Sequence, residues 1–265
     1  MAVKFINNQS EDIFSSIKFL FRIVTLQRLS DFQNNKFVFV SPSKWTDPYE
    51  KAFLCAKYKF NENLYSHPLF NNLGYKVFAQ CWTASKQSEA MWRVFAPDKN
   101  GVIVKMSLKK LKTILTKISA DGLYDFYIGK VKYEDEDSLY GMKADYQVWQ
   151  SIAESKIDDY TLGLLLKKRK AFNVEDEFRI IAVKNNAIDD DPIKSFTING
   201  LLKYVEYLKF DPRMSDSEFE SEKSKILTVF SKVKIIKSRL YNDPIGKLTF
   251  GGSVPVEEDD EFIFN

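Results

Sequence analysis

Strand-like and helical segments follow one another along this chain in an irregular order, and that order limits the folds it can adopt. Alternating apolar residues or short apolar runs predict strands at 18–24, 36–40, 76–84, 101–106, 127–134, 175–183 and 232–238. Helical spacing predicts helices at 26–33, 88–96, 107–118, 214–231 and over most of 142–172. Because no regular β–α–β repeat links the strands, the pattern favours an α+β fold over a doubly wound sheet.

One domain is the expected organisation. With 265 residues the chain can bury a substantial core, and its 10 Gly and 8 Pro leave little material for long linkers. We find no internal repeat and no low-complexity segment. The sequence therefore predicts a single domain over residues 1–265, ending in an acidic tail at about 255–265.

Charge is balanced overall but locally clustered. The 39 basic and 36 acidic residues give a net charge of +3, which does not by itself indicate a nucleic-acid-binding protein. Basic residues gather at 105–112 and 167–170, and acidic residues at 133–138 and 255–262. Such runs are typical of solvated surface, although a local basic patch can also bind phosphates.

Several common site types are excluded by residue counts and motifs. Cys55, Cys81 and the single histidine, His67, are too few for a disulfide framework, a four-ligand zinc site or a histidine relay. Cys81, beside Trp82 in an apolar strand, is expected in the core. No phosphate-binding glycine loop, nucleophile elbow or H-E-x-x-H motif occurs. The sequence has no apolar signal segment and no run of transmembrane length, so the expected location is cytoplasmic, without membrane contact.

The remaining chemistry is that of carboxylates and arginines. In the segment "VEDEFRIIAV", an extended chain places Glu175, Glu177 and Arg179 on one face and Phe178 and Ile180 on the other. This strand continues as an apolar run, which is typical of a buried strand. The three charged side chains therefore predict either a solvent-exposed face or one wall of a functional site.

The order of these segments resembles the bacterial domain-of-unknown-function 2971 family. The similarity lies in "FLFRIVTLQRLSDFQNNKFVFVSPSKWTDPYE", "VFAQCWTASKQSEAMWRVFAPDKNGVIVKM", "KKRKAFNVEDEFRII" and the closing segment from Tyr207 to Leu240, and it extends over roughly 18–241. Trp45-Thr46 stand where the family usually has Phe-Asn, and Phe95 replaces the usual Tyr after Met91-Trp92.

That family in turn resembles ADP-ribosyltransferases, which implies split β-sheets with flanking helices and NAD as co-substrate. Carried onto this sequence, the resemblance implies catalytic roles for Glu177, as the carboxylate that stabilises the transition state, and for Glu175, which orients the acceptor. Arg22 would hold the pyrophosphate, because a guanidinium fork matches phosphate oxygens. Ser41 would help to position the ribose. The remaining implied cofactor-binding residues are Trp45, Asp47, Tyr49 and Trp92, and no metal ligand is implied.

The resemblance also implies an enzyme of glycosyl transfer, with a nucleic acid or protein as acceptor. Bacterial proteins of this kind are often toxins of toxin–antitoxin pairs or phage-defence effectors, so a neutralising partner is expected. The basic run at 167–170, just before the proposed catalytic strand, favours nucleic acid.

Two other functions stay open at the level of sequence. The first is a non-catalytic module that binds nucleic acid or a partner protein through basic clusters and exposed aromatic side chains. The second is a metal-dependent nuclease using Asp47, Glu50, Glu175 and Glu177, since carboxylates can hold Mg²⁺.

Overall fold

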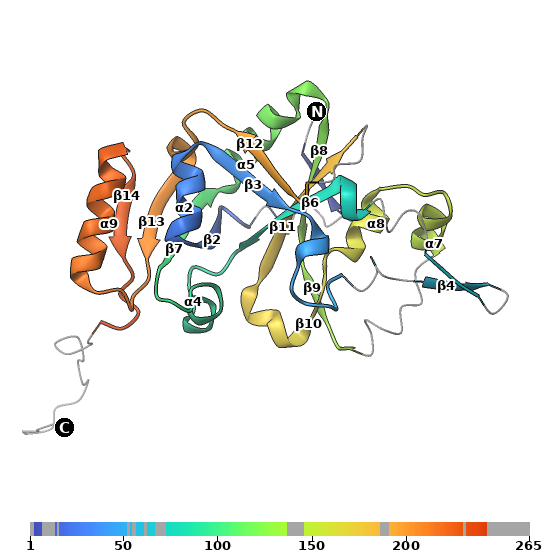
Figure 1. The fold of residues 1–265 in the computed structure, drawn as a ribbon, viewed down its shortest axis with the longest axis horizontal. Helices are drawn as coiled ribbons and strands as arrows, with labels where there is room; N and C mark the ends of the chain where they lie inside the picture. The colour runs from blue at the N-terminus through green and yellow to red at the C-terminus, as the bar shows by residue number, and fades with distance from the viewer. Residues whose placement is uncertain are drawn as a thin grey trace, which may run out of the picture.

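The computed structural model of this chain describes residues 3–6, 14, 16–51, 54, 57–60, 63–66, 73–136, 146–185, 191–229 and 232–242. Most of the strands join one large mixed sheet with helices on both faces (Figure 1). This architecture confirms the predicted α+β class. The predicted tail at 255–265 lies outside the described residues, and the single-domain boundaries stay a prediction.

Ten strands from the described ranges form the large sheet. Its main path runs β1-β8-β11-β6-β2-β7-β13-β14, with β3 on β6 and β12 on β3. The pairs β1–β8 and β13–β14 are parallel and the other pairs in the sheet are antiparallel. The strand bounds are β1 Lys4–Phe5, β2 Phe19–Thr25, β3 Lys36–Val40, β6 Val77–Thr83, β7 Gly101–Ser107, β8 Tyr124–Lys130, β11 Glu177–Lys184, β12 Ile193–Thr197, β13 Val205–Phe210 and β14 Lys234–Lys237.

Two small ribbons stand apart from the main sheet. One pairs β9 (Lys132–Glu134) with β10 (Lys167–Arg169) in parallel, and the other pairs β4 (Lys57–Phe60) with β5 (Asn63–Ser66). The β9–β10 ribbon matters most for the site, because it carries basic side chains to the start of β11.

The large sheet is split near its middle. β2 meets β6 at one registered pair, Phe21 with Thr83, whereas β3 meets β6 at Val40 and Ala79. Between these two points β6 pairs with β11 alone, with Cys81 opposite Arg179. The sheet therefore opens between β2 and β3, and this opening agrees with the predicted split-sheet architecture.

Helices begin where the sequence provides caps. Thr25 accepts a hydrogen bond from the Arg28 N–H at the start of α2 (Leu26–Gln33), and Ser88 and Ser107 cap α4 (Glu89–Phe95) and α5 (Leu108–Ile118) in the same way. The remaining helices are α7 (Tyr146–Ala153), α8 (Asp159–Leu164) and α9 (Asp216–Val229), with short 3₁₀ turns η2 (Pro42–Lys44), η4 (Ser119–Asp121), η5 (Lys170–Glu175) and η6 (Leu201–Tyr204). No helix in the described ranges is long and apolar enough to cross a membrane.

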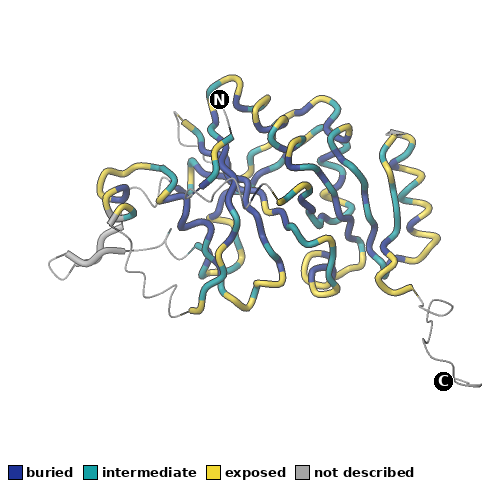
Figure 2. Tube along the Cα trace, turned by 180° about the vertical axis from the view of Figure 1, so that it is seen from behind, coloured by how far each residue is buried: buried dark blue, intermediate teal, exposed yellow. Residues whose placement is uncertain are grey.

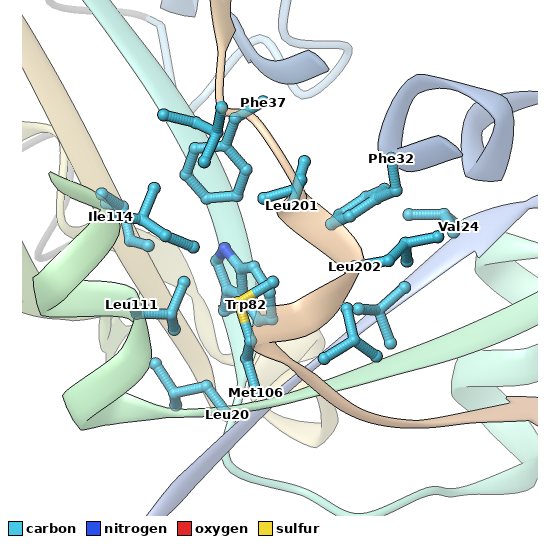
Figure 3. Close-up of a cluster of buried hydrophobic side chains, with 14 of the residues drawn as sticks. Leu20, Val24, Phe32, Phe37, Trp82, Met106, Leu111, Ile114, Leu201 and Leu202 are labelled. Atoms are coloured by element: carbon cyan, nitrogen blue, oxygen red, sulfur yellow. The ribbon is translucent and has the colours of Figure 1, made fainter. Parts of the chain in front are cut away.

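Side-chain alternation assigns the two faces of the sheet to different cores. The largest core lies under α2, α5, η6 and α9, and Figure 3 shows Trp82 surrounded there by side chains including Leu111 and Leu202. The Trp82 indole N–H donates to Gln80, 2.7 Å away, so this buried polar group is satisfied. On the opposite face, β6 and β11 pack against α7 and α8, and β2 and β7 pack against α4 through Trp92. Figure 2 shows buried strands in the middle and exposed residues along the outer sides of the helices.

Three expectations about elements are wrong. The strand predicted at 127–134 is divided at Val131 into β8 and β9. Residues 167–169, predicted to be helical, form β10, which pairs in parallel with β9. The predicted strand at 175–183 begins at Glu177, since Glu175 ends η5 and Asp176 adopts a left-handed conformation with φ of 39°.

Candidate functional site

A cavity of about 390 Å³ lies where β2 and β6 separate. Its walls come from β2, the segment 44–50, β6, α4, β10 and the junction of η5 with β11. Arg22, Trp45, Asp47, Glu175 and Glu177, all predicted site residues, line it together. The structure therefore brings Arg22 and Glu177 to one cavity, although they are 155 positions apart in the chain, counting from 22 to 177.

Arg22 lies at a junction between two cavities. A second cavity of about 230 Å³ shares the lining residues Arg22, Ile23, Val40 and Phe95 with the first. Arg22 is half-buried, and its side chain makes no hydrogen bond or ion pair with any other described residue. Burial lowers the pKa of its guanidinium to about 10, so the group remains positive at neutral pH. A half-buried, unpaired cation between two cavities is suited to bind an anion.

Glu177 is held by two cations. The Arg179 Nε donates to one carboxylate oxygen of Glu177 at 2.8 Å and its Nη2 to the other at 3.0 Å. The Lys168 ammonium donates to the second oxygen at 3.2 Å, and the Tyr133 hydroxyl accepts from the Glu177 backbone N–H at 2.9 Å. Glu177 is 3% exposed, so these contacts fix both its charge and its orientation.

Burial and charge oppose each other at this carboxylate. Burial disfavours the ionised form of Glu177, but the charge and hydrogen bonds of Arg179 and the charge of Lys168 outweigh burial and hold the pKa at about 2. Glu175 behaves differently, because burial raises its pKa above the usual value despite its bond to Lys168. The cavity thus holds one firmly ionised carboxylate beside one that is more easily protonated.

Lys168 is the common partner of three carboxylates. Its ammonium lies 3.0 Å from Glu50, 2.7 Å from Glu175 and 3.2 Å from Glu177. Burial disfavours its charge, but Glu177, Glu50 and Glu175 together raise the pKa of Lys168 above its usual value. Arg179 also contacts Glu50 at 2.6 Å, so the cluster is one connected network.

Asp47 anchors the outer wall of the cavity. One carboxylate oxygen accepts from the Tyr49 backbone N–H at 3.0 Å and from Arg169 at 3.2 Å, which combines the expected turn with an ion pair. The other oxygen is buried and has no hydrogen-bond partner. Tyr49 stacks under the Arg169 guanidinium at 4.0 Å and does not line the cavity.

Cys81 lies in the cavity, not in the core as its sequence context predicted. It belongs to the part of β6 that pairs with β11 alone, and its side chain is accessible from the opening between β2 and β3. Desolvation by the surrounding protein and the neighbouring Glu177 raise the pKa of the thiol, so it stays protonated at neutral pH. This thiol is therefore a neutral group at the site.

Two further residues predicted to bind the cofactor lie outside the cavity. Ser41 is fully buried, and its hydroxyl donates to the Gly74 carbonyl at 2.7 Å and caps η2. Trp92 is also fully buried, because α4 packs it against Phe21 and Ile103. Neither residue lines the cavity, whereas Trp45 does, with its ring 4.2 Å from the Arg179 guanidinium carbon.

The basic run at 167–170 does not offer free charge to a polyanion. Lys167 pairs with Glu134 at 3.4 Å, Arg169 with Glu136 at 3.1 Å, and Lys170 with Asp135 at 2.5 Å, while Lys168 is buried among carboxylates. The run therefore gives no support to a nucleic-acid acceptor, since Glu134, Asp135 and Glu136 neutralise three of its charges.

Neither Lys168 nor Arg179 has a predicted role in the site, and Glu50 is predicted only as a metal ligand of the alternative nuclease. In the described ranges no group of acidic, cysteine or histidine residues has the arrangement of a metal site. The cation that Glu50, Glu175 and Glu177 share in this structure is Lys168. Lys168 carries no local signal, because it stands in the run 167–170 with three other basic residues.

Comparisons with known proteins agree with part of the sequence analysis. The model of the family described as "Protein of unknown function (DUF2971)" matches residues 91–180, which confirms the family resemblance over that range. A search of curated proteins finds no significant match. Among solved structures, DarT from Thermus sp. 2.9 aligns in its complex with carba-NAD+ at 11% identity and a TM-score of 0.32, and in its complex with NAD+ at 10% and 0.33. Each alignment covers 84% of this chain and 96% of that chain.

Proposed function

We propose that this chain is an ADP-ribosyltransferase-like enzyme that uses NAD to modify a nucleic acid or protein acceptor. The observation that carries the proposal is the position of Arg22, an unpaired cation on the wall shared by two cavities. A dinucleotide has two bulky halves joined by a doubly charged pyrophosphate. Cavities of about 390 and 230 Å³ on either side of one guanidinium match that distribution of volume and charge.

Glu177 would supply the electrostatic part of catalysis. Weakening the bond between nicotinamide and ribose develops positive charge on the sugar, as in glycoside cleavage. A carboxylate that is already ionised, buried and held by Arg179 needs little reorganisation to face that charge. Because Arg179 and Lys168 partly neutralise Glu177, the low pKa has a cost: the carboxylate attracts a developing cation less strongly than a free one would.

Glu175 would act on the acceptor. It contacts Lys168 through one carboxylate oxygen and lines the same cavity, and burial raises its pKa toward the range suited to proton transfer. In this role it would hold the acceptor group and take its proton as the new bond to ribose forms.

Calorimetric titration with NAD tests the proposal. The wild-type protein is expected to bind NAD, and Arg22→Ala to bind at least tenfold more weakly, because the pyrophosphate loses a charged partner. Glu177→Gln is expected to keep most of the binding while abolishing release of nicotinamide, since its role lies in the transition state. Arg93→Ala is the matched control, because Arg93 is an exposed arginine paired with Glu89 outside the cavity.

Two outcomes would count against the proposal. The first is no detectable NAD binding by the folded wild type, and the second is equal binding by the wild type and Arg22→Ala. Circular dichroism of each variant separates a lost contact from a lost fold.

The proposal extends to a role as a toxin or phage-defence effector restrained by a neutralising partner. Its support is the chemistry itself, because unrestrained modification of nucleic acid or protein harms the cell that carries it. Induced expression of the wild type in bacteria is expected to stop growth, and Glu177→Gln to restore growth at equal protein level. Equal growth with both proteins would remove this extension without affecting the NAD measurement.

A further inference from the structure

One face of the sheet carries basic and aromatic side chains beside the cavity. On the half-sheet β2-β7-β13-β14, the largest core takes one face, and on the other α4 covers Phe21 and Ile103. Beyond α4, that second face presents Phe19, Lys105, Tyr207, Lys209 and Lys234, and we refer to these five residues as the basic sheet face.

Strand register shows that these side chains share one face. Lys105 is opposite Phe21 on β2 and Tyr207 on β13, and Tyr207 is opposite Lys234 on β14. Residues directly opposite one another in a sheet point to the same side. Because Phe21 also lines the main cavity, the basic sheet face begins where the cavity ends.

Among the described residues, no acidic side chain forms an ion pair with the lysines of this face. The Lys105 ammonium lies 3.6 Å from the centre of the Phe19 ring and 5.0 Å from that of Tyr207, and Lys209 donates to the amide oxygen of Gln87. Burial lowers the pKa of Lys209, and the like charges of Lys105 and Lys86 lower it further. Lysines that destabilise one another's charge attract an anion more strongly than paired lysines do.

An open groove along α5 shares Phe19 with the basic sheet face. This groove of about 790 Å³ is lined by Lys18, Lys109, Lys112 and Lys117, and its described lining residues include no acidic side chain. Lys110, on the same helix, points elsewhere and pairs with Glu206 at 2.8 Å. Of the basic cluster at 105–112, Lys105 therefore lies on the basic sheet face, and Lys109 and Lys112 line the groove. Lys110 alone of these four is neutralised by an ion pair.

We propose that the basic sheet face and the groove along α5 bind single-stranded nucleic acid. Phosphates pair with the lysines, and bases stack on the rings of Phe19 and Tyr207, as cationic grooves with aromatic platforms hold single strands in general. Lys105 leaves the Phe19 ring when a base arrives and turns to a phosphate, which its flexible stem allows. The inference does not depend on NAD chemistry in the cavity.

Fluorescence anisotropy with a labelled single-stranded oligothymidine tests the inference on the full chain. The wild type is expected to bind at about 50 mM salt and to weaken steeply toward about 200 mM. The triple variant Lys105→Gln, Lys209→Gln, Lys234→Gln is expected to bind at least tenfold more weakly, with the slope of log affinity against log salt reduced by about 0.7 for each lost contact. Tyr207→Leu is expected to lose roughly fivefold or more in affinity at an unchanged slope, because it removes stacking and no charge.

A matched control separates this surface from net charge. Lys156→Gln, Lys223→Gln, Lys225→Gln removes the same charge from lysines that are already ion-paired, and this triple variant is expected to bind as the wild type does. Equal binding by the two triple variants, or no binding by the wild type at about 50 mM salt, would overturn the inference. Lysine-dependent binding to vesicles with anionic lipid, without binding to the oligonucleotide, would overturn it in favour of a membrane surface. NAD titration of each variant is recorded in parallel, so a failure of the proposed activity is distinguishable from a failure of this surface.

Discussion

Arg179 shows how a single residue can hold a site together. It is fully buried, donates twice to Glu177 and once each to Glu50 and the Leu165 carbonyl, and stacks on Trp45. A buried pair of this kind adds little net stability over an apolar replacement of both partners, yet removal of one partner leaves the other charge unpaired. The asymmetry makes Arg179 the most sensitive position of the network.

We expect Arg179→Met to lower the free energy of unfolding by roughly 3–5 kcal/mol, because Glu177 and Glu50 lose a shared cation while staying buried. Urea unfolding measures the change. Arg93→Met, at an exposed pair on α4, is the control and is expected to change stability little. If Arg179→Met lowered the free energy of unfolding as little as the control does, the prediction would be wrong. Water would then have replaced Arg179 as the partner of the two carboxylates.

At this scale the sequence identified only part of the site. The family resemblance named Arg22 and Glu177, and both line the cavity. Lys168 was not predictable, because a lysine in a basic run is indistinguishable from surface until its partners are known. Its three carboxylates come from the loop at Glu50, the end of η5 and the start of β11. No local pattern records that convergence.

Elements were predictable where their signals are local. The bounds of β2, α2, β3, α4, β7 and α5 follow from alternation, helical spacing and Ser or Thr caps within each segment. β13 and β12 were missed, because their pairing partners are distant in the chain and their polar residues mask the alternation. The split between β2 and β6 depends on pairing alone, so only the family resemblance predicted it.

Close packing of β8 against the loop before β10 leads to a prediction at this scale. A Cβ on Gly129 would lie 2.2 Å from Leu166 Cδ1, and Leu166 is buried. We expect Gly129→Ala to cost roughly 1–3 kcal/mol of stability through overpacking. Guanidinium unfolding measures the cost.

Gly74→Ala is the control, because no atom of the described residues lies within 4 Å of its added Cβ. Combining Gly129→Ala with Leu166→Ala is expected to cost less than the sum of the two single changes, since the smaller side chain leaves room. Strict additivity would mean that the contact is not the cause.

The stability of the whole molecule should fall in acid partly through Glu177. Its pKa is about 2 in the folded protein against an ordinary value of 4.5, so the unfolded chain takes up the proton first as the pH falls. The stability that Glu177 contributes is therefore complete above about pH 4.5 and lost as the pH falls toward about 2. Glu175 acts in the opposite direction, because its raised pKa favours the folded state in acid.

Urea unfolding at about pH 6 and about pH 3 measures this dependence. Glu177→Gln is expected to lose less stability between the two conditions than the wild type does, and Glu175→Gln to lose more. Glu220→Gln, on the exposed pair with Lys223, is the control. Parallel pH profiles for the wild type and Glu177→Gln would contradict the assignment.

Because distant segments of the chain build the cavity, a ligand can bind there only when the protein is folded. The cavity walls are contributed by segments from Phe21 to Glu177, so no fragment of the chain, and no unfolded state, can offer the same binding surface. By thermodynamic linkage, a compound present at 100 times its dissociation constant would raise stability by about 2.7 kcal/mol. NAD is expected to raise the melting temperature of the wild type but not of Arg22→Ala. A thermal-shift screen of other metabolites would identify what the cavity accepts with no assumption about the reaction.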